Sequence, residues 1–515
     1  MFKSYCFNLS SVFAEIVRAN RNRTALIIDE GTQLTYHDLD VLSNKIANFL
    51  LNHNVTRRDR IAVVLDKSVC AYAIILAAVK VGATYFVVDR KSPADRSRRI
   101  IEQCNPKVLF LEQDLRLPED YGMQIRCDRD SRDNPFYGSF PENAPRLDYQ
   151  IDGSDPVYIM FTSGSTGVPK GAVMSNNNLI NFIQWSRKEY QFTNEDVFSN
   201  LNPLYFDNSV FDIYSSLFLG ATLVAFDSNI MREPHEVVRK LNRFKCTVVF
   251  AVPSFFVYLL TLKILRRTNL ESARKIIFGG EGFPKVKLKK LFDEFHRFAE
   301  IYNVYGPTEC TCICSNYRIT AEDFDSTEGI PPIGHLIGNF SHYVLNGNEP
   351  AQVGQPGELC LGGPCVGLGY YNQPGLTEKA FVQNPLNDKF FERIYRTGDM
   401  IFENPDDGKI YFVGRKDLQI KHQGYRIELE EIQYAAMKIR GIDEAIALHG
   451  MRNGVSEIIV VVASKEDLEQ EAIKRALTEF LPSYMIPSKI FVRGVLPKNA
   501  NGKIDRQALM KEYGG

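Results

Sequence analysis

The 515 residues are enough for several domains with buried cores, and 44% hydrophobic and 24% charged residues are ordinary for a globular protein. Because 61 basic residues face 62 acidic ones, and no basic stripe is interleaved with aromatic residues, the composition gives no support to nucleic-acid binding. No apolar run reaches the roughly 18 residues of a membrane helix, and the N-terminus lacks a signal-peptide pattern. A cytoplasmic protein without a membrane partner is therefore expected.

Strand-like apolar runs alternate with helical patterns through most of the chain. An amphipathic helix is predicted near the N-terminus, and Leu39, Leu42, Ile46 and Phe49 have helical spacing in the next segment. Alternation of this kind is typical of an α/β protein with mostly parallel sheets. Buried strands are predicted at 60–65, 108–112, 157–162, 221–226, 246–252 and 275–280.

The ten cysteines are thinly spread, which indicates reduced thiols rather than a disulfide framework. Cys310, Cys312 and Cys314 form a cluster that strand alternation would place on one face. Since neither a CxxC pair nor a nearby histidine completes a metal set, small apolar fillers of a sheet or pocket wall are favoured over a metal site.

From about residue 345 the sequence becomes rich in glycine and short strands, which indicates a barrel-like subdomain. A hairpin is predicted with its turn at 406–408. A smaller unit of about 100 residues follows Asp417, with a strand at 457–464 and a helix at 467–481.

The stretch YIMFTSGSTGVPKGAVM (158–174) ends a buried strand in a loop of Gly, Ser and Thr. Such a loop offers backbone N–H groups and hydroxyls with little bulk, which is how proteins surround phosphates, and Lys170 adds a positive charge. The spacing is not that of a Walker A motif, because Gly171 follows Lys170, so a P-loop NTPase is disfavoured. Taken alone, the loop is also compatible with a tight structural turn.

Further motifs follow in order: NVYGPTE, GELCLGGPCVGLGYYNQPGLTEKAF, YRTGD, GRKDLQIKHQGYRIE and NGKIDR. With TSGSTGVPKG they resemble the AMP-forming adenylating enzyme superfamily over essentially the whole chain, and most closely its amino-acid-activating members. The resemblance implies an N-terminal adenylation core at 1–416, made of two mostly parallel α/β sheet subdomains and a small β-barrel-like one. It also implies a mobile α+β C-terminal domain at 417–515.

The reaction implied by the resemblance has two halves. A carboxylate attacks the α-phosphorus of ATP to give acyl-AMP and pyrophosphate, and a thiol then attacks the acyl carbon and releases AMP. Because the substrate carboxylate and ATP are both negatively charged, the site must supply positive charge and must hold the two reactants in position. The ATP and AMP contacts would come from Thr162, Ser163, Gly164, Ser165, Thr166, Gly167, Lys170, Gly280, Glu281, Asn303, Tyr305, Asp399 and Arg415.

Particular roles also come from the resemblance. Tyr305 would stack on adenine, Thr308 would contact the α-phosphate, and Asp399 would accept hydrogen bonds from the ribose hydroxyls. Glu309 would hold Mg²⁺, a cation that suits carboxylate and phosphate oxygens. Lys503 would reach both the substrate carboxylate and the α-phosphate.

On their own these patterns have simpler explanations, because YGPTE can be a turn with a solvated glutamate and Lys503 a solvated surface group. The resemblance further makes Asp417 the hinge, and assigns Lys421 and Gly424 to the conformation that forms the thioester.

Asp207 would pair with the substrate ammonium group, although an aspartate here can also cap the helix that follows. The wall expected around Asp207 carries no second charge, and it resembles pockets for branched aliphatic amino acids such as isoleucine or valine. Alanine, proline, leucine and nonproteinogenic relatives stay open, because one methylene is worth only about 1–3 kcal/mol of discrimination. Gly279 would leave room, and Asn208 would either bind a polar substrate or shorten the pocket. Its lining would be Asp207, Asn208, Phe211, Phe250, Ile277, Gly279, Val304, Cys312 and Ile313.

A phosphopantetheine thiol is expected to come from a separate carrier protein, because no carrier domain is recognised in the chain.

The alternatives to an amino-acid adenylating enzyme are an acyl- or aryl-CoA synthetase of the same superfamily, a D-alanine–carrier protein ligase, and a catalytically silent scaffold. Asp207 argues against the first, since an acid without an amino group would leave this carboxylate unpaired. The D-alanine ligases usually have cysteine where this chain has Gly279.

Overall fold

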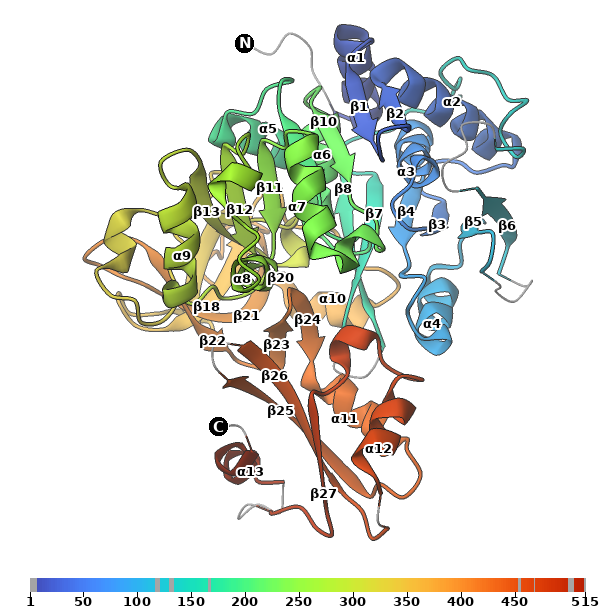
Figure 1. The fold of residues 1–515 in the computed structure, drawn as a ribbon. Helices are drawn as coiled ribbons and strands as arrows, with labels where there is room; N and C mark the ends of the chain where they lie inside the picture. The colour runs from blue at the N-terminus through green and yellow to red at the C-terminus, as the bar shows by residue number, and fades with distance from the viewer. Residues whose placement is uncertain are drawn as a thin grey trace.

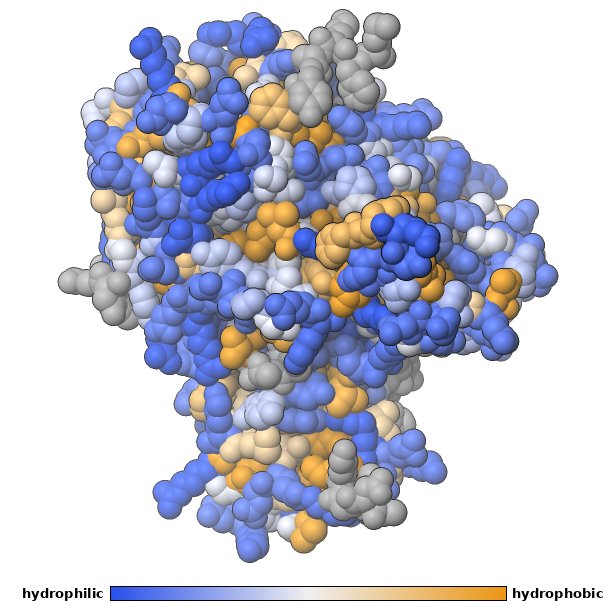
Figure 2. Space-filling view, turned by 180° about the vertical axis from the view of Figure 1, so that it is seen from behind, coloured by the Kyte–Doolittle hydropathy of each residue, from blue (hydrophilic) through white to orange (hydrophobic). Residues whose placement is uncertain are grey.

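The computed structural model describes residues 7–115, 121–128, 134–164, 168–452, 455–466, 468–498 and 504–513. A large N-terminal body is followed by a smaller C-terminal unit, drawn in orange to red, that projects from one end of it (Figure 1). The opposite side has the same outline and a largely hydrophilic surface with scattered apolar patches (Figure 2). None of the helices in the described ranges is long and apolar enough to span a membrane.

The larger sheet has nine strands, and its six central strands from β13 to β1 are parallel. Antiparallel strands border this core on both sides. In spatial order the strands are β15 (His335–Leu336), β14 (Ser315–Arg318), β13 (Glu300–Tyr305), β12 (Lys275–Gly279), β11 (Val248–Ala251), β9 (Val197–Asn200), β10 (Thr222–Ala225), β1 (Thr24–Ile27) and β2 (Gln33–Thr35).

A second sheet has seven strands, of which β7, β4, β3, β5 and β6 are parallel. Their order is β19 (Gly369–Tyr370), β8 (Lys170–Ser175), β7 (Pro156–Thr162), β4 (Thr84–Val87), β3 (Arg60–Val64), β5 (Val108–Glu112) and β6 (Met123–Cys127). The predicted strands of both parallel sheets are thereby confirmed to within one or two residues.

Helices surround and separate the two sheets. The helices of this body are α1 (Leu9–Asn20), α2 (Tyr36–Asn52), α3 (Val69–Val81), α4 (Ala94–Cys104), α5 (Asn176–Tyr190), α6 (Asn208–Leu217), α7 (Pro234–Arg243), α8 (Pro253–Thr261) and α9 (Lys285–Phe295). All residues of α3 are buried, which is expected of a helix that is apolar on every side. Ser68 caps its first turn, and Gly82 ends it in a left-handed conformation with φ of 67°.

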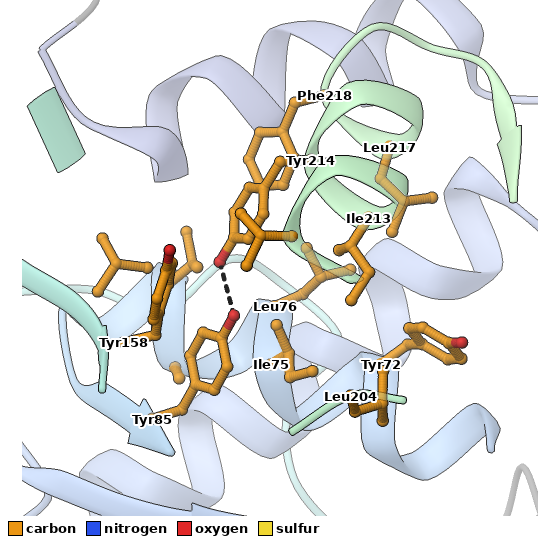
Figure 3. Packing of buried hydrophobic residues seen from close by; sticks show 14 of the residues in the cluster. Tyr72, Ile75, Leu76, Tyr85, Tyr158, Leu204, Ile213, Tyr214, Leu217 and Phe218 are labelled. Atoms are coloured by element: carbon orange, nitrogen blue, oxygen red, sulfur yellow. Dashed lines mark hydrogen bonds between the residues drawn. The ribbon is translucent and has the colours of Figure 1, made fainter. Parts of the chain in front are cut away.

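Side chains from α3, α6 and the second sheet meet in one core cluster (Figure 3), which residues of the nine-stranded sheet such as Phe198 also join. The hydroxyl oxygens of Tyr85 and Tyr214 lie 3.0 Å apart and share a hydrogen bond. The nearby Tyr158 hydroxyl is also buried, but it has no hydrogen-bond partner within the described part of the chain. The layer that carries α6 is therefore joined to the second sheet by packing and by a buried polar contact.

The third sheet is antiparallel and contains the predicted hairpin, whose turn includes Gly408 with φ of 66°. Its strands are β17 (Glu349–Pro350), β16 (Ser341–Asn346), β18 (Gly357–Gly362), β21 (Arg393–Glu403), β20 (Phe381–Gln383) and β22 (Ile410–Arg415), with helix α10 (Pro374–Ala380) beside them.

The C-terminal unit begins with a hairpin of β23 (Gln419–His422) and β24 (Tyr425–Glu428), which is followed by α11 (Leu429–Met437). A three-stranded sheet is formed by β25 (Glu444–Arg452), β26 (Val455–Ala463) and β27 (Lys489–Arg493), with α12 (Gln470–Leu477) and α13 (Arg506–Tyr513). The predicted strand at 457–464 is confirmed. The helix predicted over 467–481 is shorter: α12 spans only Gln470–Leu477, and a turn over 478–480 leads from it to Pro482.

The backbone of the segment with Cys310, Cys312 and Cys314 is not the extended strand that was expected. Thr311 and Cys312 have φ values of 57° and 73°, so the chain turns there and cannot continue as an extended strand. Cys310 and Cys314 consequently join one apolar cluster and Cys312 another. All nine cysteines within the described ranges are buried and free of disulfides. No group of three or more potential metal ligands occurs there either.

Replacing Tyr85 by phenylalanine should lower the free energy of unfolding by about 1–2 kcal/mol, because the Tyr214 hydroxyl would then be buried without its partner. Tyr158→Phe is the matched control, since it removes a buried hydroxyl that has no partner in the described structure. That variant should be neutral or slightly stabilising. Chemical unfolding midpoints measure both, and an equal loss in the two variants would contradict the assigned hydrogen bond.

Candidate functional site

Polar side chains gather where the carboxyl ends of the nine-stranded sheet meet the third sheet and the β23–β24 hairpin. Loops at the carboxyl ends of parallel strands are where α/β proteins place their ligands. Asp207 follows β9, Glu281 follows β12, and Tyr305 ends β13, while Asp399 and Arg415 come from paired positions on β21 and β22. Residues that are more than 200 positions apart in the sequence thus border one site.

Asp207 lies at the start of α6, but its carboxylate makes no capping hydrogen bond within the described structure. It accepts a hydrogen bond of 2.6 Å from the Thr308 hydroxyl instead. Burial raises the pKa of Asp207 to about 6, although the Thr308 hydroxyl opposes this shift. The geometry therefore disfavours the helix-cap alternative and leaves a buried carboxylate at the site.

A small cavity of about 40 Å³ lies beside Asp207. Of the expected pocket residues, it is lined by Asp207, Asn208, Phe250, Val304, Cys312 and Ile313. Phe211, Ile277 and Gly279 do not line it in this arrangement. Phe211 lies behind the wall, with its ring centroid 5.1 Å from that of Phe250. At Gly279 a methyl group would approach the Val304 carbonyl oxygen to 2.5 Å, so strand packing rather than pocket room requires glycine.

The expected nucleotide residues near the third sheet form a continuous polar chain. Asp399 accepts hydrogen bonds from the Tyr305 hydroxyl and from Arg415. Arg415 also donates to both carboxylate oxygens of Asp417, over 2.6 and 2.7 Å. Tyr305, Asp399, Arg415 and the expected hinge residue are thus brought together, and Arg415 bridges the two carboxylates.

Other expected nucleotide contacts lie at the edge of this group. Asn303 is buried and donates to the Pro332 carbonyl over 2.8 Å. Gly280 has φ of 88°, a conformation that favours glycine. The Glu281 carboxylate accepts from the backbone N–H groups of Ser254 and Gly424, over 2.6 and 3.3 Å. Glu281 therefore joins the N-terminal body to the tip of the hairpin.

Glu309 is fully buried, and each of its carboxylate oxygens has a partner. The Tyr370 hydroxyl donates to one oxygen over 2.6 Å, and Arg426 of β24 donates to the other over 2.7 Å. Burial alone raises the pKa of a carboxyl group, but Arg426 and Tyr370 hold the pKa of Glu309 below its ordinary value. Glu309 is therefore ionised at neutral pH, as a magnesium ligand must be. One carboxylate is adequate for Mg²⁺, which also takes water and phosphate oxygens.

The glycine-rich loop contacts the same hairpin. The Ser163 hydroxyl donates to the Arg426 carbonyl over 2.6 Å and accepts from the Glu428 N–H over 3.1 Å. Lys170 forms a 3.0 Å ion pair with Glu428. Thr162 lies at the end of β7, and Gly164 has no space for a side chain, because a methyl group would meet the Val168 carbonyl. Ser165, Thr166 and Gly167 lie outside the described residues.

Lys421 and Gly424 of the hairpin both line the small cavity. The Lys421 ammonium group lies 4.7 Å from the centroid of the Tyr305 ring. A methyl group at Gly424 would overlap Val252, which shows how closely the hairpin tip approaches the N-terminal body.

Lys503 lies outside the described residues. The flanking residues Lys498 and Ile504 form a bridge near α13, which lies at the far end of the C-terminal unit (Figure 1).

Comparison with known proteins identifies the family. Residues 13–371 match the family described as AMP-binding enzyme. The chain belongs to this family.

Some AMP-binding enzymes match this chain over nearly their whole length, whereas others match it over a small part of theirs. It is 32% identical to D-alanine--D-alanyl carrier protein ligase of Bacillus cereus over 488 residues, which cover 93% of this chain and 94% of the relative. It is 33% identical to Bacitracin synthase 3 of Bacillus licheniformis over 505 residues, or 97% of this chain. The chain spans only 8% of the length of that synthase.

Solved structures share the fold of this AMP-binding enzyme. An artificially fused adenylation–PCP di-domain NRPS from Klebsiella oxytoca superposes with a TM-score of 0.84 at 22% identity, over 95% of this chain and 94% of the other. The Vibrio cholerae adenylation domain AlmE, in complex with glycyl-adenosine-5'-phosphate, gives 0.80 at 22% identity, with 99% of both chains covered. The two-part α/β architecture is therefore confirmed.

Sequence reasoning missed several residues of this AMP-binding enzyme that hold the hairpin on the site. Arg426 and Glu428 stand in the quoted motif GRKDLQIKHQGYRIE, where their charges were a usable signal. Tyr370, which donates to Glu309, stands in the quoted motif GELCLGGPCVGLGYYNQPGLTEKAF, whereas the buried ion pair between Arg96 of α4 and Glu431 of α11 had no such signal. These two charges come from segments more than 300 positions apart, and only the tertiary fold brings them together.

Asp207→Asn should raise the free energy of unfolding at pH 7 by on the order of 2 kcal/mol. The folded pKa of about 6 exceeds the ordinary value of 3.8, so the stability that Asp207 contributes is complete below about pH 4 and is lost as the pH rises through 6. The asparagine variant lacks this loss. Unfolding measured from pH 4 to 7 should therefore diverge between the two proteins, and parallel curves would contradict the shift.

Reversing the charge of Arg96 should loosen the C-terminal unit, because it leaves the buried Glu431 beside a second carboxylate. We expect hydrogen-exchange protection of residues 419–428 to fall by about 100-fold in Arg96→Glu. The double variant Arg96→Glu with Glu431→Arg should recover most of it. Arg98→Glu is the control, since it breaks only the more exposed pair with Asp95 on the same helix. Equal effects of the two single variants would argue against the Arg96 contact.

Proposed function

We propose that this chain activates an amino acid as aminoacyl-AMP at the expense of ATP and transfers it to the phosphopantetheine thiol of a separate carrier protein. The observation that carries the proposal is the buried Asp207 carboxylate at the cavity wall. A buried carboxylate is costly without a direct ion pair, and Asp207 forms none within the described residues, although Lys421 and Arg426 act to lower its pKa. A substrate ammonium group would supply that pair. The D-alanine--D-alanyl carrier protein ligase relatives support the same class.

In the first half-reaction, the residues around Asp399 and Glu309 would hold ATP. Asp399 would take the ribose hydroxyls, Tyr305 the adenine, and Thr308 the α-phosphate, with Lys170 and the glycine-rich loop on the terminal phosphates. Glu309 would hold Mg²⁺, which neutralises phosphate charge when bound. The intermediate would then be an aminoacyl phosphate anhydride whose ammonium group stays on Asp207.

In the second half-reaction, the hairpin would take the position that the structure shows. Lys421 and Gly424 line the cavity, and a cleft of about 1400 Å³ opens between the hairpin and residues such as Tyr205 and Val252. A cleft of this size admits a long, thin thiol-bearing arm. We propose that residues 417–515 move about Asp417 relative to 1–416, and that Lys503 enters the site in the first half-reaction.

The expected branched aliphatic substrate, isoleucine or valine, stays a prediction. Phe250, Val304 and Ile313 supply an apolar wall, which favours a short aliphatic side chain over a charged one. The cavity is small in this arrangement, so bulky aromatic substrates are disfavoured.

ATP–pyrophosphate exchange with Mg²⁺ across L- and D-amino acids, fatty acids and aryl acids tests the proposal. We expect exchange with a short amino acid and a loss of at least about 100-fold in Asp207→Ala, which removes the partner of the ammonium group. Lys503→Ala should lose most exchange while unfolding like the wild type. Exchange only with acids that lack an amino group would instead identify an acyl- or aryl-CoA synthetase, and exchange with none would remove the enzymatic assignment.

A further inference from the structure

Lys67 is a buried charge that the proposed reaction does not use. It follows β3 of the second sheet, is only 3% exposed, and forms no ion pair among the residues that the structure describes. Its ammonium group donates to three backbone carbonyl oxygens, those of Asn200, Leu201 and Phe226, over 2.6, 2.9 and 2.8 Å. Three acceptors match the three N–H donors of a protonated lysine, so these carbonyl groups select the charged side chain.

The three carbonyl groups lie where two neighbouring parallel strands end. Asn200 is the last residue of β9, and Phe226 directly follows β10, which pairs with β9. The loop 201–207 begins at this point and ends at Asp207, directly before α6. Because the ammonium group comes from the second sheet, it fixes the beginning of this loop against both sheets.

Buried hydrogen bonds continue from this point to the substrate cavity. The Asn200 amide donates to the Asp212 carboxylate of α6 over 2.9 Å. The Asn202 amide donates to the same carboxylate oxygen and to the Phe250 carbonyl oxygen, over 3.1 Å in both cases. Phe250 lines the small cavity on which Asp207 also borders. The strand ends that the ammonium group holds are thus connected to two residues of the cavity wall.

The position of Lys67 is costly for the fold. Burial lowers the pKa of Lys67 to about 7, although the carboxylates of Asp212, Asp66 and Asp227 oppose the shift. Burying an ammonium group without a direct ion pair requires free energy that an apolar side chain would not require. What the charge provides is a fixed geometry of the strand ends from which the site is built.

We infer that Lys67 is a positioning residue for the binding of the amino acid. By holding the ends of β9 and β10, it fixes the loop 201–207 and with it the carboxylate of Asp207. Through the buried hydrogen bonds it also fixes Phe250 at the cavity wall. The inference rests on the proposed function and adds to it a residue that touches no substrate.

Lys67→Met tests the inference, because methionine has a similar length but neither charge nor N–H donor. In ATP–pyrophosphate exchange, KM for the best amino acid of the wild type should rise by about tenfold or more, since Asp207 is no longer held against the substrate ammonium group. KM for ATP should change by less than about threefold, because Tyr305 and Asp399 come from β13 and β21. A merely structural role would lower the fraction of active enzyme and hence kcat, but it would leave KM for the amino acid unchanged.

Lys240→Met is the matched control. Lys240 of α7 is also buried, and it donates to the Ile28 carbonyl oxygen and, over 2.6 Å, to that of Ala225. It holds β1 and β10 in this way but forms no hydrogen bond with the loop 201–207 in the described structure. KM for the amino acid should therefore stay within about twofold of the wild-type value.

Asn202→Ala is a second variant, which breaks the connection to the Phe250 carbonyl while the ammonium group stays in place. It should raise KM for the amino acid by about threefold or more. An unchanged KM in Lys67→Met, or equal increases in Lys67→Met and Lys240→Met, would overturn the inference and leave the proposed function intact. If Lys67→Met does not fold, an unchanged KM in Asn202→Ala would overturn it in the same way. Exchange with no amino acid by the wild type would overturn both.

Discussion

The buried carboxylate of Glu309 requires a cation, and the structure supplies one from the other half of the molecule. Glu309 belongs to the N-terminal body and Arg426 to the hairpin of the C-terminal unit, so neutralising this charge and docking that unit are one event. Leaving such a carboxylate unpaired costs several kcal/mol. The relative position of the two units is therefore coupled to the charge balance of the site, as well as to the apolar contact between them.

Other charged side chains of the hairpin also contact side chains of the N-terminal body that belong to the proposed site. Glu428 pairs with Lys170, and Lys421 lies over the Tyr305 ring. Under the proposed roles, Lys170 would meet the terminal phosphates of ATP. Its ammonium group can pair either with Glu428 or with a phosphate, since one ammonium group neutralises one neighbour at a time. Binding of ATP with its metal and docking of the hairpin in the position seen here are then alternatives, which is the behaviour that two successive half-reactions require.

The alternating pattern of apolar runs was sufficient to predict the parallel strands, because buried strands in such sheets are nearly continuous apolar segments. It failed at Cys312, where two residues with positive φ turn the chain, since nothing in a run of Cys, Thr and Ile signals this conformation. Among site residues, the motifs predicted Asp207, Tyr305, Glu309 and Asp399 as neighbours. Ion pairs such as that of Arg96 with Glu431 depend on packing between distant segments, which local patterns do not encode.

Gly279 shows that a residue can have a structural reason which the sequence does not reveal, beside the pocket role expected of it. From the sequence it is a gap in a pocket wall, whereas in the fold it is required because β12 and β13 approach closely at Val304. Asp207 shows a cost of another kind. Nearly every buried charge in a stable protein is paired, yet this carboxylate forms no ion pair within the described residues, and burial raises its pKa although Lys421 and Arg426 oppose the shift. A ligand that brings a cation directly to Asp207 would offset this cost, which is what the ammonium group of an amino acid supplies under the proposed function.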